Sequence, residues 1–458
     1  MPCDGMRSHL RASTSEPTHV VSEPVEEARW TDRLKYFHPT EPGQILDGRF
    51  KTIAKLGYGR GSTVWLAENL ECRIRSQSKL PRYVSIKIAA LDHDEDAADE
   101  MEFLKLISNA NPSHEGLKYI RVPLDTFDLQ GENGTHSCLV FEPMRETLYK
   151  FQRDLPGEKF KLPLFKAYMY MLLKALDYLH TECRLIHTDI KDDNILLSPM
   201  TDSDIKPFAD YCQTIDQPRY IQQEDGRVTH VSHDEILGTR GMAWPRLADF
   251  NTCFPVLPGN FCHSAEIQSD RYRAPEVFLG IPWSYKVDIW NLGLMMWNLL
   301  GDNDMLENSV DDDGKYDAHV HLAQLISMSG EPPPLLVKRE RMCRENKLDD
   351  FVVNSKGKVC ETMNEYWGGP FFDDDGTLHF QGPRLQVSSP TLSNYSVGRM
   401  IRKDLIKEKN GIPDFLNDFT EKDRSQFLDL ANNMIRWLPE NRKTAAELLQ
   451  HPFFIHED

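Results

Sequence analysis

The stretch HTDIKDDNILL, residues 187–197, places an aspartate, a lysine and an asparagine on one short turn ahead of an apolar run. Transfer of a phosphoryl group needs a carboxylate near the attacking hydroxyl, a cation beside the transferred phosphate, and oxygen ligands for magnesium. Asp189 can supply the carboxylate, Lys191 the cation on the γ-phosphate, and Asn194 a magnesium ligand. The same residues also suit a polar turn between a helix and a strand, so the stretch alone leaves both interpretations open.

A glycine-rich segment lies upstream, in LGYGRGSTVW at residues 56–65, between two strand-like runs. Glycines at positions such as 57 and 59 let main-chain N–H groups approach phosphates closely. Tight hairpins use the same residues, so this motif is weak by itself.

The next predicted strand, YVSIKI at residues 83–88, carries Lys87, which we expect to contact the phosphates. A lysine on a strand is normally solvated, so Lys87 supports a phosphate site only through its position after the glycine-rich segment. The helix predicted over residues 96–108 offers Glu100 as a partner for Lys87. Glu95 and Glu102 are rival candidates.

Four further signals follow in order: LADF at 247–250, YRAPE at 272–276, DIWNLG at 288–293, and an arginine at 442 in the last predicted helix. Together with the three stretches above, this order resembles the eukaryotic protein kinases over about residues 45–455. The resemblance implies that Asp249 is a second magnesium ligand and that Asp288 anchors the main chain of the 187–194 loop. It also implies a buried ion pair between Glu276 and Arg442.

The fold implied by this resemblance is α+β and two-lobed, with a small β-rich N-lobe over 45–143 and a larger helical C-lobe over 144–455. A flexible arm is expected over residues 1–44, and insertions at about 198–244 and about 302–410. ATP should lie between the lobes, with Phe141 behind the adenine and main-chain contacts from Glu142 and Met144. The residues implied to contact ATP are Leu56, Gly57, Tyr58, Gly59, Arg60, Gly61, Ser62, Val64, Lys87, Glu100, Phe141, Glu142 and Met144.

Longer stretches resemble the SR-protein kinase family in particular. They are YFHPTEPGQILDGRFKTIAKLGYGRGSTVWLAENL at 36–70, NGTHSCLVFEPM at 133–144, and the opening loop, together with the place of the first insertion. This resemblance implies transfer of phosphate from Mg·ATP to serine or threonine of Arg/Ser-rich proteins, and a part in splicing regulation. Lys191 in the loop favours serine and threonine over tyrosine.

Several positions depart from the usual kinase pattern. Thr188, as in the SR-protein kinases, replaces the arginine that pairs with a phosphorylated activation loop, so we expect activity without that phosphorylation. Asn251 replaces a glycine, which removes backbone freedom but no ligand. Ser62 stands at the third glycine position, and Asp270 replaces an arginine, which alters the pocket beside the substrate serine.

The acidic positions that the SR-protein kinases use to dock Arg-rich peptides fall, by alignment near HLAQLISMSG (321–330), on Val320 and Ser327. Acids gather instead at Asp302, Asp304, Glu307 and Asp311–Asp313. This run suits a solvated loop, or it could replace the lost dock for a basic peptide.

The composition sets further bounds. A net charge of −18 argues against non-specific binding to nucleic acid or to anionic membranes. Nine scattered cysteines indicate reduced thiols, and no run of about 18 apolar residues predicts a membrane span. We expect a monomer in the cytoplasm, the nucleus or both. Residues 1–20 suit a disordered tail or a weak transit peptide.

Two rival functions come from different classes. A pseudokinase would bind partners without turnover, but Lys87, Asp189, Asn194 and Asp249 are all present, and only Asn251 favours it. A small-molecule kinase of choline or aminoglycoside type would share an H-x-D-x-x-x-x-N loop. Such enzymes lack the APE and DIWxxG motifs found here.

Overall fold

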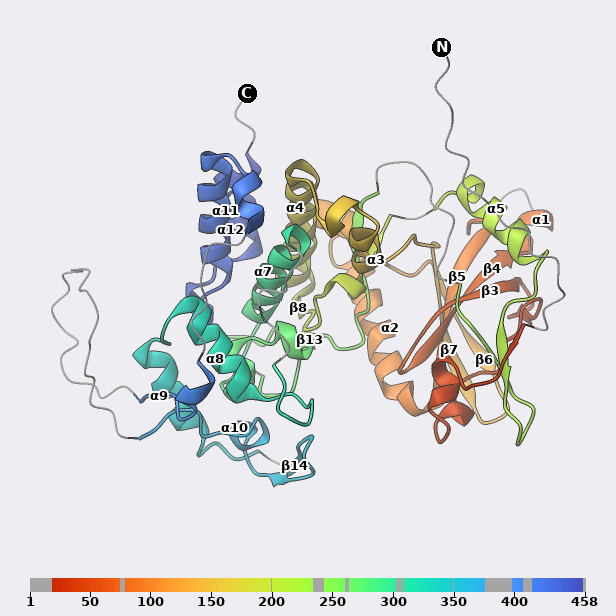
Figure 1. Cartoon of the computed structure of the whole chain (residues 1–458). Helices are drawn as coiled ribbons and strands as arrows, with labels where there is room; N and C mark the ends of the chain where they lie inside the picture. The colour runs from red at the N-terminus through yellow and green to blue at the C-terminus, as the bar shows by residue number, and fades with distance from the viewer. Residues whose placement is uncertain are drawn as a thin grey trace, which may run out of the picture. The chain divides into compact units, whose positions relative to one another are not determined.

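The computed structural model of the protein describes residues 19–74, 79–198, 200–233, 243–259, 263–301, 306, 309–348, 350–374, 398–406 and 414–455. The chain forms two compact units (Figure 1). The β-rich unit comprises Met1–Asp94, Leu124–Pro143 and Met200–Thr239. The helical unit comprises Glu95–Pro123, Met144–Pro199 and Arg240–Asp458.

An antiparallel sheet forms the centre of the β-rich unit. Its strand order among the described residues is β2-β3-β4-β5-β7-β6. The alternation in β5 sends Val84, Ile86 and Ile88 to one face, where they pack with Trp65 and Val140. The strands are β2 (Ile45–Leu46), β3 (Phe50–Gly59), β4 (Ser62–Asn69), β5 (Tyr83–Ala89), β6 (Asp125–Gln130) and β7 (Thr135–Phe141), with the short helix α1 (Glu71–Ile74) after β4.

Helix α5 (Asp202–Cys212) packs on the opposite face of this sheet. Its Ile205 and Phe208 contact Leu66 and Tyr83, which alternate with the first face (Figure 1). The sequence showed no clear period over 198–244, because α5 carries few apolar residues and has Pro207 inside it. The structure therefore places residues 200–233 of this insertion in the β-rich unit rather than in the helical one.

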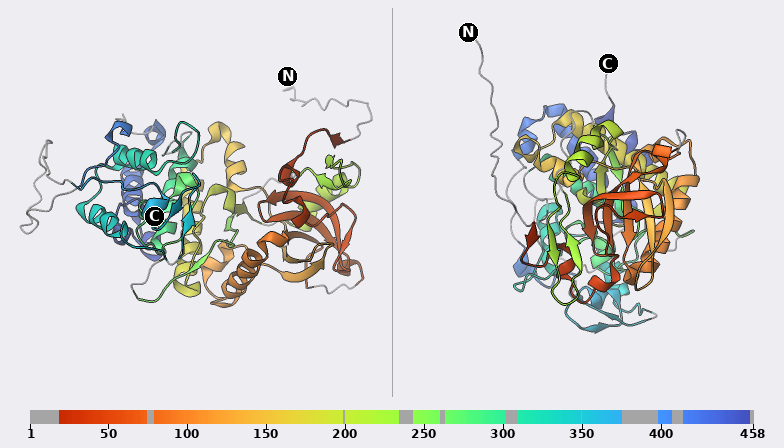
Figure 2. Two further views of the ribbon diagram at one scale, coloured as in Figure 1. Left: turned by 90° about the horizontal axis from the view of Figure 1, so that it is seen from below. Right: turned by 90° about the vertical axis from the view of Figure 1, so that its right-hand side faces the viewer.

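The chain from residue 19 onward differs from the expected flexible arm. Strand β1 (Val20–Val21) pairs in parallel with β10 (Arg219–Ile221), which pairs with β11 (Val228–His230) of the insertion (Figure 2, right). Two 3-10 turns follow, η1 (Glu26–Arg29) and η2 (Leu34–Tyr36), with buried Ala28 and Leu34. Residues 19–44 are thus tied to the insertion, whereas residues 1–18 lie outside the described residues.

The helical unit is organised around α7 (Lys286–Leu300), which is apolar on all sides and buried from its second residue onward. Phe165 of α4 meets Phe427 of α11 and Phe453 beyond α12 in edge-to-face contacts. The helices are α2 (Asp94–Asn109), α3 (Leu148–Arg153), α4 (Leu162–Tyr178), α6 (Pro275–Phe278), α7, α8 (Ala318–Ser329), α9 (Pro334–Cys343), α10 (Met363–Tyr366), α11 (Glu421–Met434) and α12 (Ala445–Leu449). The strand pairs are β8 (Leu185–Ile186) with β13 (Phe254–Pro255), β9 (Ile195–Leu197) with β12 (Pro245–Leu247), and β14 (Val352–Val353) with β15 (Val359–Cys360).

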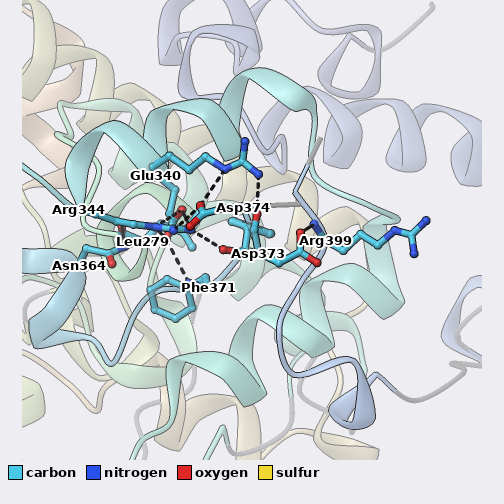
Figure 3. A network of polar contacts seen from close by, with 10 residues as sticks. Leu279, Glu340, Arg344, Asn364, Phe371, Asp373, Asp374 and Arg399 are labelled. Carbon is cyan, nitrogen blue, oxygen red and sulfur yellow. Dashed lines mark hydrogen bonds and ion pairs between the residues drawn. The ribbon is translucent and has the colours of Figure 1, made fainter. Parts of the chain in front are cut away.

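A buried carboxylate ties the second insertion to the segment after α6 (Figure 3). Glu340 of α9 is fully buried and accepts bonds from the guanidinium of Arg344, the side-chain amide of Asn364 (3.0 Å) and the N–H of Phe371 (3.1 Å). The same amide of Asn364 donates to the carbonyl of Leu279 (3.0 Å). Glu340 therefore joins α9 to α10, and Asn364 links both to Leu279, just after α6.

The predicted α+β class, with a β-rich unit and a mainly helical one, is confirmed. In the part of the chain that the structure describes, no helix has the length and apolar character to cross a bilayer.

Candidate active site

The opening loop connects β8 to β9, and the structure brings its three polar residues together. The ammonium of Lys191 lies 2.6 Å from Oδ2 of Asp189. The amide nitrogen of Asn194 donates to the same oxygen and to the main-chain carbonyl of Asp189, both at 2.9 Å. The Asp189 side chain keeps 20% of its surface exposed, so a substrate hydroxyl can reach it.

Asp288, at the start of α7, holds the main chain of this loop. Its carboxylate is fully buried and accepts the N–H groups of His187 and Thr188, both at 2.8 Å. It also meets Nε2 of His180 at 2.8 Å. Thr188 has φ of 69°, a costly conformation for a β-branched residue. The bonds to Asp288 hold Thr188 in this conformation next to Asp189.

The ring of His187 links the loop to the segment that carries Asp249. The N–H of Asp189 donates to Nδ1 of His187 (3.3 Å), so the ring proton belongs on Nε2, 3.0 Å from the carbonyl oxygen of Ala248. The ring also packs edge-to-face on Phe250. Because the N–H of Ala248 bonds to the carbonyl of Asn194 (2.9 Å), the two segments are fixed together at one end of the β9–β12 pair.

Asp249 and Glu100 both act electrostatically on Arg121, and all three residues belong to the helical unit. Glu100 is buried on α2, whereas its rivals Glu95 and Glu102 are exposed. Burial lowers the pKa of Arg121 to about 10, and the nearby carboxylates of Glu100 and Asp249 oppose that shift. Sequence reasoning missed Arg121, since one arginine after a 3-10 turn belongs to no motif.

The residues expected at the phosphates lie in the β-rich unit. Leu56 to Gly59 end β3, Arg60 and Gly61 form the turn, and Ser62 and Val64 begin β4. A Cβ at Gly57 or Gly59 would meet no atom within 4 Å, and neither glycine has a positive φ. Neither packing nor backbone strain therefore requires glycine at these two positions.

Lys87 lies on β5 beside this segment, with Val64 as its partner on β4 and Leu139 as its partner on β7. Phe141 ends β7 and is buried, and the carbonyl of Glu142 accepts the hydroxyl of Ser85 at 3.3 Å. Met144 is buried in the helical unit. The pairing of Lys87 with Glu100 joins residues of the two units and stays a prediction.

Glu276 and Arg442 form a fully buried bidentate ion pair with distances of 2.6 and 2.7 Å. The guanidinium also lies over the ring of Trp290, 4.8 Å from its centroid. This pair fastens α6, which carries the APE residues, to the C-terminal part of the unit.

The structure describes some of the residues that the sequence analysis named for substrate docking. Val320 and Ser327 lie on α8, and Ser327 bonds to its own helix at Ala323. Asp311 accepts the N–H groups of Asp313 and Lys315, so it shapes its own loop. Asp270 pairs with Arg273 at 2.9 Å. Asp302, Asp304 and Glu307 lie outside the described residues.

Comparison with known proteins agrees with this arrangement. The protein kinase domain model matches residues 50–454. A serine/threonine protein kinase of Aspergillus fumigatus is 28% identical over 419 residues, covering 92% of this chain and 88% of the relative. The serine/threonine-protein kinase SRPK of Physarum polycephalum is 28% identical over 440 residues, covering 91% and 88%. Human SRSF protein kinase 3 is 36% identical over 163 residues, which cover 35% of this chain and 27% of the relative. The chain belongs to the protein kinase family, and it is a serine/threonine kinase similar to the SR-protein kinases.

Proposed function

We propose that this kinase transfers the γ-phosphate of Mg·ATP to serines of Arg/Ser-rich proteins. In this proposal, Asp189 accepts the hydrogen bond and then the proton of the substrate hydroxyl. The observation that carries this proposal is the arrangement around Asp189. Lys191 and Asn194 both donate to Oδ2, while Asp288 fixes the strained main chain before it. A carboxylate so held meets a hydroxyl without rearranging, which is how such residues contribute to phosphoryl transfer.

Lys191 has two tasks in this proposal. At 2.6 Å it holds one carboxylate oxygen of Asp189, which leaves the other oxygen to accept the hydroxyl proton. Its positive charge also lies where negative charge gathers on the transferred phosphate. Lys87 would contact the other phosphates of the nucleotide from β5.

Asn194 and Asp249 would hold magnesium. Both offer the hard oxygen ligands that this ion prefers. Because the amide nitrogen of Asn194 is used by Asp189, its amide oxygen is the atom left to face a cation. Asp249 has a φ of 67°, a strained conformation of the kind that clusters at functional sites. When bound, the ion would neutralise charge on the phosphates.

Independence from activation-loop phosphorylation is supported by Thr188. Its hydroxyl donates to the carbonyl of Thr252 at 2.6 Å and thus holds the segment after Asp249 without a charge. An arginine at this position would need a phosphate to neutralise it. We therefore expect phosphatase treatment to leave the activity of the purified kinase unchanged. Loss of activity on that treatment would contradict this part of the proposal.

The substrate class rests on the similarity to kinases named SRPK and SRSF protein kinase, and on the net charge of −18, which suits a basic substrate. The pseudokinase alternative is not favoured, because the chain matches relatives named as serine/threonine protein kinases along most of its length.

The test is transfer of labelled phosphate from Mg·ATP to two peptides of equal charge, an Arg/Ser repeat and a lysine-rich peptide with scattered serines. We expect the Arg/Ser peptide to be phosphorylated at a several-fold higher kcat/KM, and both signals to vanish with Asp189→Ala. Equal rates on the two peptides would retain the kinase and overturn the substrate class. Transfer that survives Asp189→Ala would overturn the assigned role of that residue.

A further inference from the structure

We propose that Arg33, which lies before the kinase domain match, is a positioning residue that holds the turn of the glycine-rich segment for ATP. Its Nη2 donates to the main-chain carbonyl of Arg60 at 2.8 Å, and its Nε donates to Asp92 at 2.7 Å. Arg60 lies between Gly59 and Gly61 at the tip of the β3–β4 hairpin. One guanidinium therefore fixes the tip to the 3-10 turn Leu91–His93 that leads into α2.

Aromatic residues orient this guanidinium. It lies over the rings of Trp30 and Phe37, 5.7 and 5.9 Å from their centroids, and the two rings stack on each other. Trp30 also contacts the ring of Tyr58, which is half exposed within the glycine-rich segment. The N-terminal chain thus contacts this segment at two points, the Tyr58 ring and the Arg60 carbonyl.

A buried charged cluster fastens the N-terminal chain beneath this contact. Lys55, the residue before Leu56, is fully buried. Its ammonium meets Glu26 at 2.7 Å, both carboxylate oxygens of Glu27 at 2.7 and 2.5 Å, and the carbonyl of His230 at 3.1 Å. Gln217 of the first insertion bonds to both main-chain groups of Lys55, at 3.1 and 3.0 Å. The N-terminal chain and the insertion are thereby joined to β3 just before the glycine-rich segment begins.

Side-chain packing adds little support to the glycine-rich segment. Gly57 and Gly59 have no neighbour within 4 Å of a Cβ position, so the main chain there is held by its pairing with β4 and by contacts at the turn. Within the glycine-rich segment, the hydrogen bond from Arg33 goes to a main-chain carbonyl oxygen. It therefore constrains the main-chain N–H groups that the glycine pattern predicts to contact the phosphates. A loosened turn must be ordered when ATP binds, which weakens binding.

The alternative is a purely structural role, in which Arg33 only stabilises the N-terminal chain. A structural role would lower the unfolding temperature and leave the KM for ATP unchanged in the folded enzyme. A positioning role raises the KM for ATP at unchanged unfolding temperature, because Arg33 is partly exposed and replaceable by water.

The experiment measures the KM for ATP, kcat and the unfolding temperature of Arg33→Ala in the full chain. We expect the KM to rise about tenfold, as the loss of one charge-assisted hydrogen bond suggests, with a smaller change in kcat. Arg33→Lys keeps the charge without the planar fork and should recover part of the effect. Arg29→Ala is the matched control, since Arg29 lies in the same segment, is exposed and bonds only to Pro24 among its described partners.

Asp92→Asn provides a second route should Arg33→Ala fold poorly. Because Asp92 holds Arg33, this variant should raise the KM as well, and the double variant should add little to Arg33→Ala. An unchanged KM in Arg33→Ala, or effects of the two substitutions that add fully, would overturn the inference.

The inference rests on the ATP phosphates binding at the glycine-rich segment. Gly59→Ala tests that binding site separately from the role of Arg33. A raised KM in Gly59→Ala with an unchanged KM in Arg33→Ala would overturn only the role of Arg33. Unchanged values in both variants would overturn the proposed phosphate site along with it.

Discussion

Single residues show where chemistry and folding make different demands on this chain. Thr188 takes a positive φ although it is β-branched, and two N–H bonds to Asp288 hold the loop in place. Gly57 and Gly59 show the reverse, because the fold would accept a side chain at either position. Neither the strain at Thr188 nor the vacant space at the two glycines serves the stability of the protein, which supports the roles proposed for these segments in phosphate transfer.

Gly59→Ala should therefore leave the free energy of unfolding within about 0.5 kcal/mol of the wild type, since Ala fits the native φ there. The KM for ATP should rise several-fold, because the added methyl group would lie where we propose that the phosphates approach. Steady-state kinetics and urea denaturation together test both halves. Gly48→Ala is the control, since its φ of 65° predicts lost stability with an unchanged KM. A Gly59→Ala enzyme that unfolds early and binds ATP normally would contradict this account.

At the scale of elements, the connections that matter are carried by a few buried polar groups. Asp288 joins α7 to the loop at 187–194, Glu276 joins α6 to Arg442, and Glu340 joins α9 to Asn364 of α10. Each carboxylate is fully buried and satisfied by several donors. Removing one partner leaves donors buried without acceptors, which costs more than the bond itself contributes.

Asp288→Asn should lower the free energy of unfolding by about 2 kcal/mol, since an amide cannot accept from both N–H groups and from His180 as the carboxylate does. The loop would also lose its fixed conformation, so kcat should fall while the KM for ATP changes little. Asp177→Asn is the comparison, because Asp177 on α4 meets His114 at 3.6 Å near the surface and should cost little. Equal losses in the two variants would argue against the anchoring role of Asp288.

The limits of sequence reasoning also lie at this scale. The loop at 187–194 and the glycine-rich segment could be predicted because their residues are close in the chain and their spacing is set by local geometry. The bonds from Lys55 to Glu27 and from Gln217 to Lys55 span 28 and 162 residues and follow no period. The ordered N-terminal chain and the placement of the first insertion were missed for that reason, as was Arg121.

Across the whole molecule, buried neutral histidines make stability depend on pH. Burial lowers the pKa of His38 and of His230 to about 4, and that of His321 to about 3, from 6.5. The unfolded chain binds protons on these residues below about pH 6.5, while the folded chain stays neutral until about pH 4. The folded state is therefore favoured above pH 6.5 and loses stability as the pH falls.

Between pH 7.5 and pH 5, each of these histidines should reduce the free energy of unfolding by about 2 kcal/mol. Urea denaturation at several pH values measures the slope. His321→Gln cannot take up a proton beside Arg273 and the Tyr316 hydroxyl. Between pH 7.5 and pH 5, this variant should therefore lose about 2 kcal/mol less of its free energy of unfolding than the wild type does. An unchanged slope in this variant would show that His321 is not buried as a neutral ring.

The central claim is that Asp189 receives the substrate hydroxyl within a loop held by Lys191, Asn194 and Asp288. The measurement that tests it most directly is the single-turnover rate of phosphate transfer from Mg·ATP to a serine peptide by Asp189→Asn, with the affinity for ATP measured separately. We predict a rate lower by about two to four orders of magnitude and an ATP affinity within a few-fold of the wild type. A rate close to that of the wild type would contradict the account, because another group would then have to receive the hydroxyl.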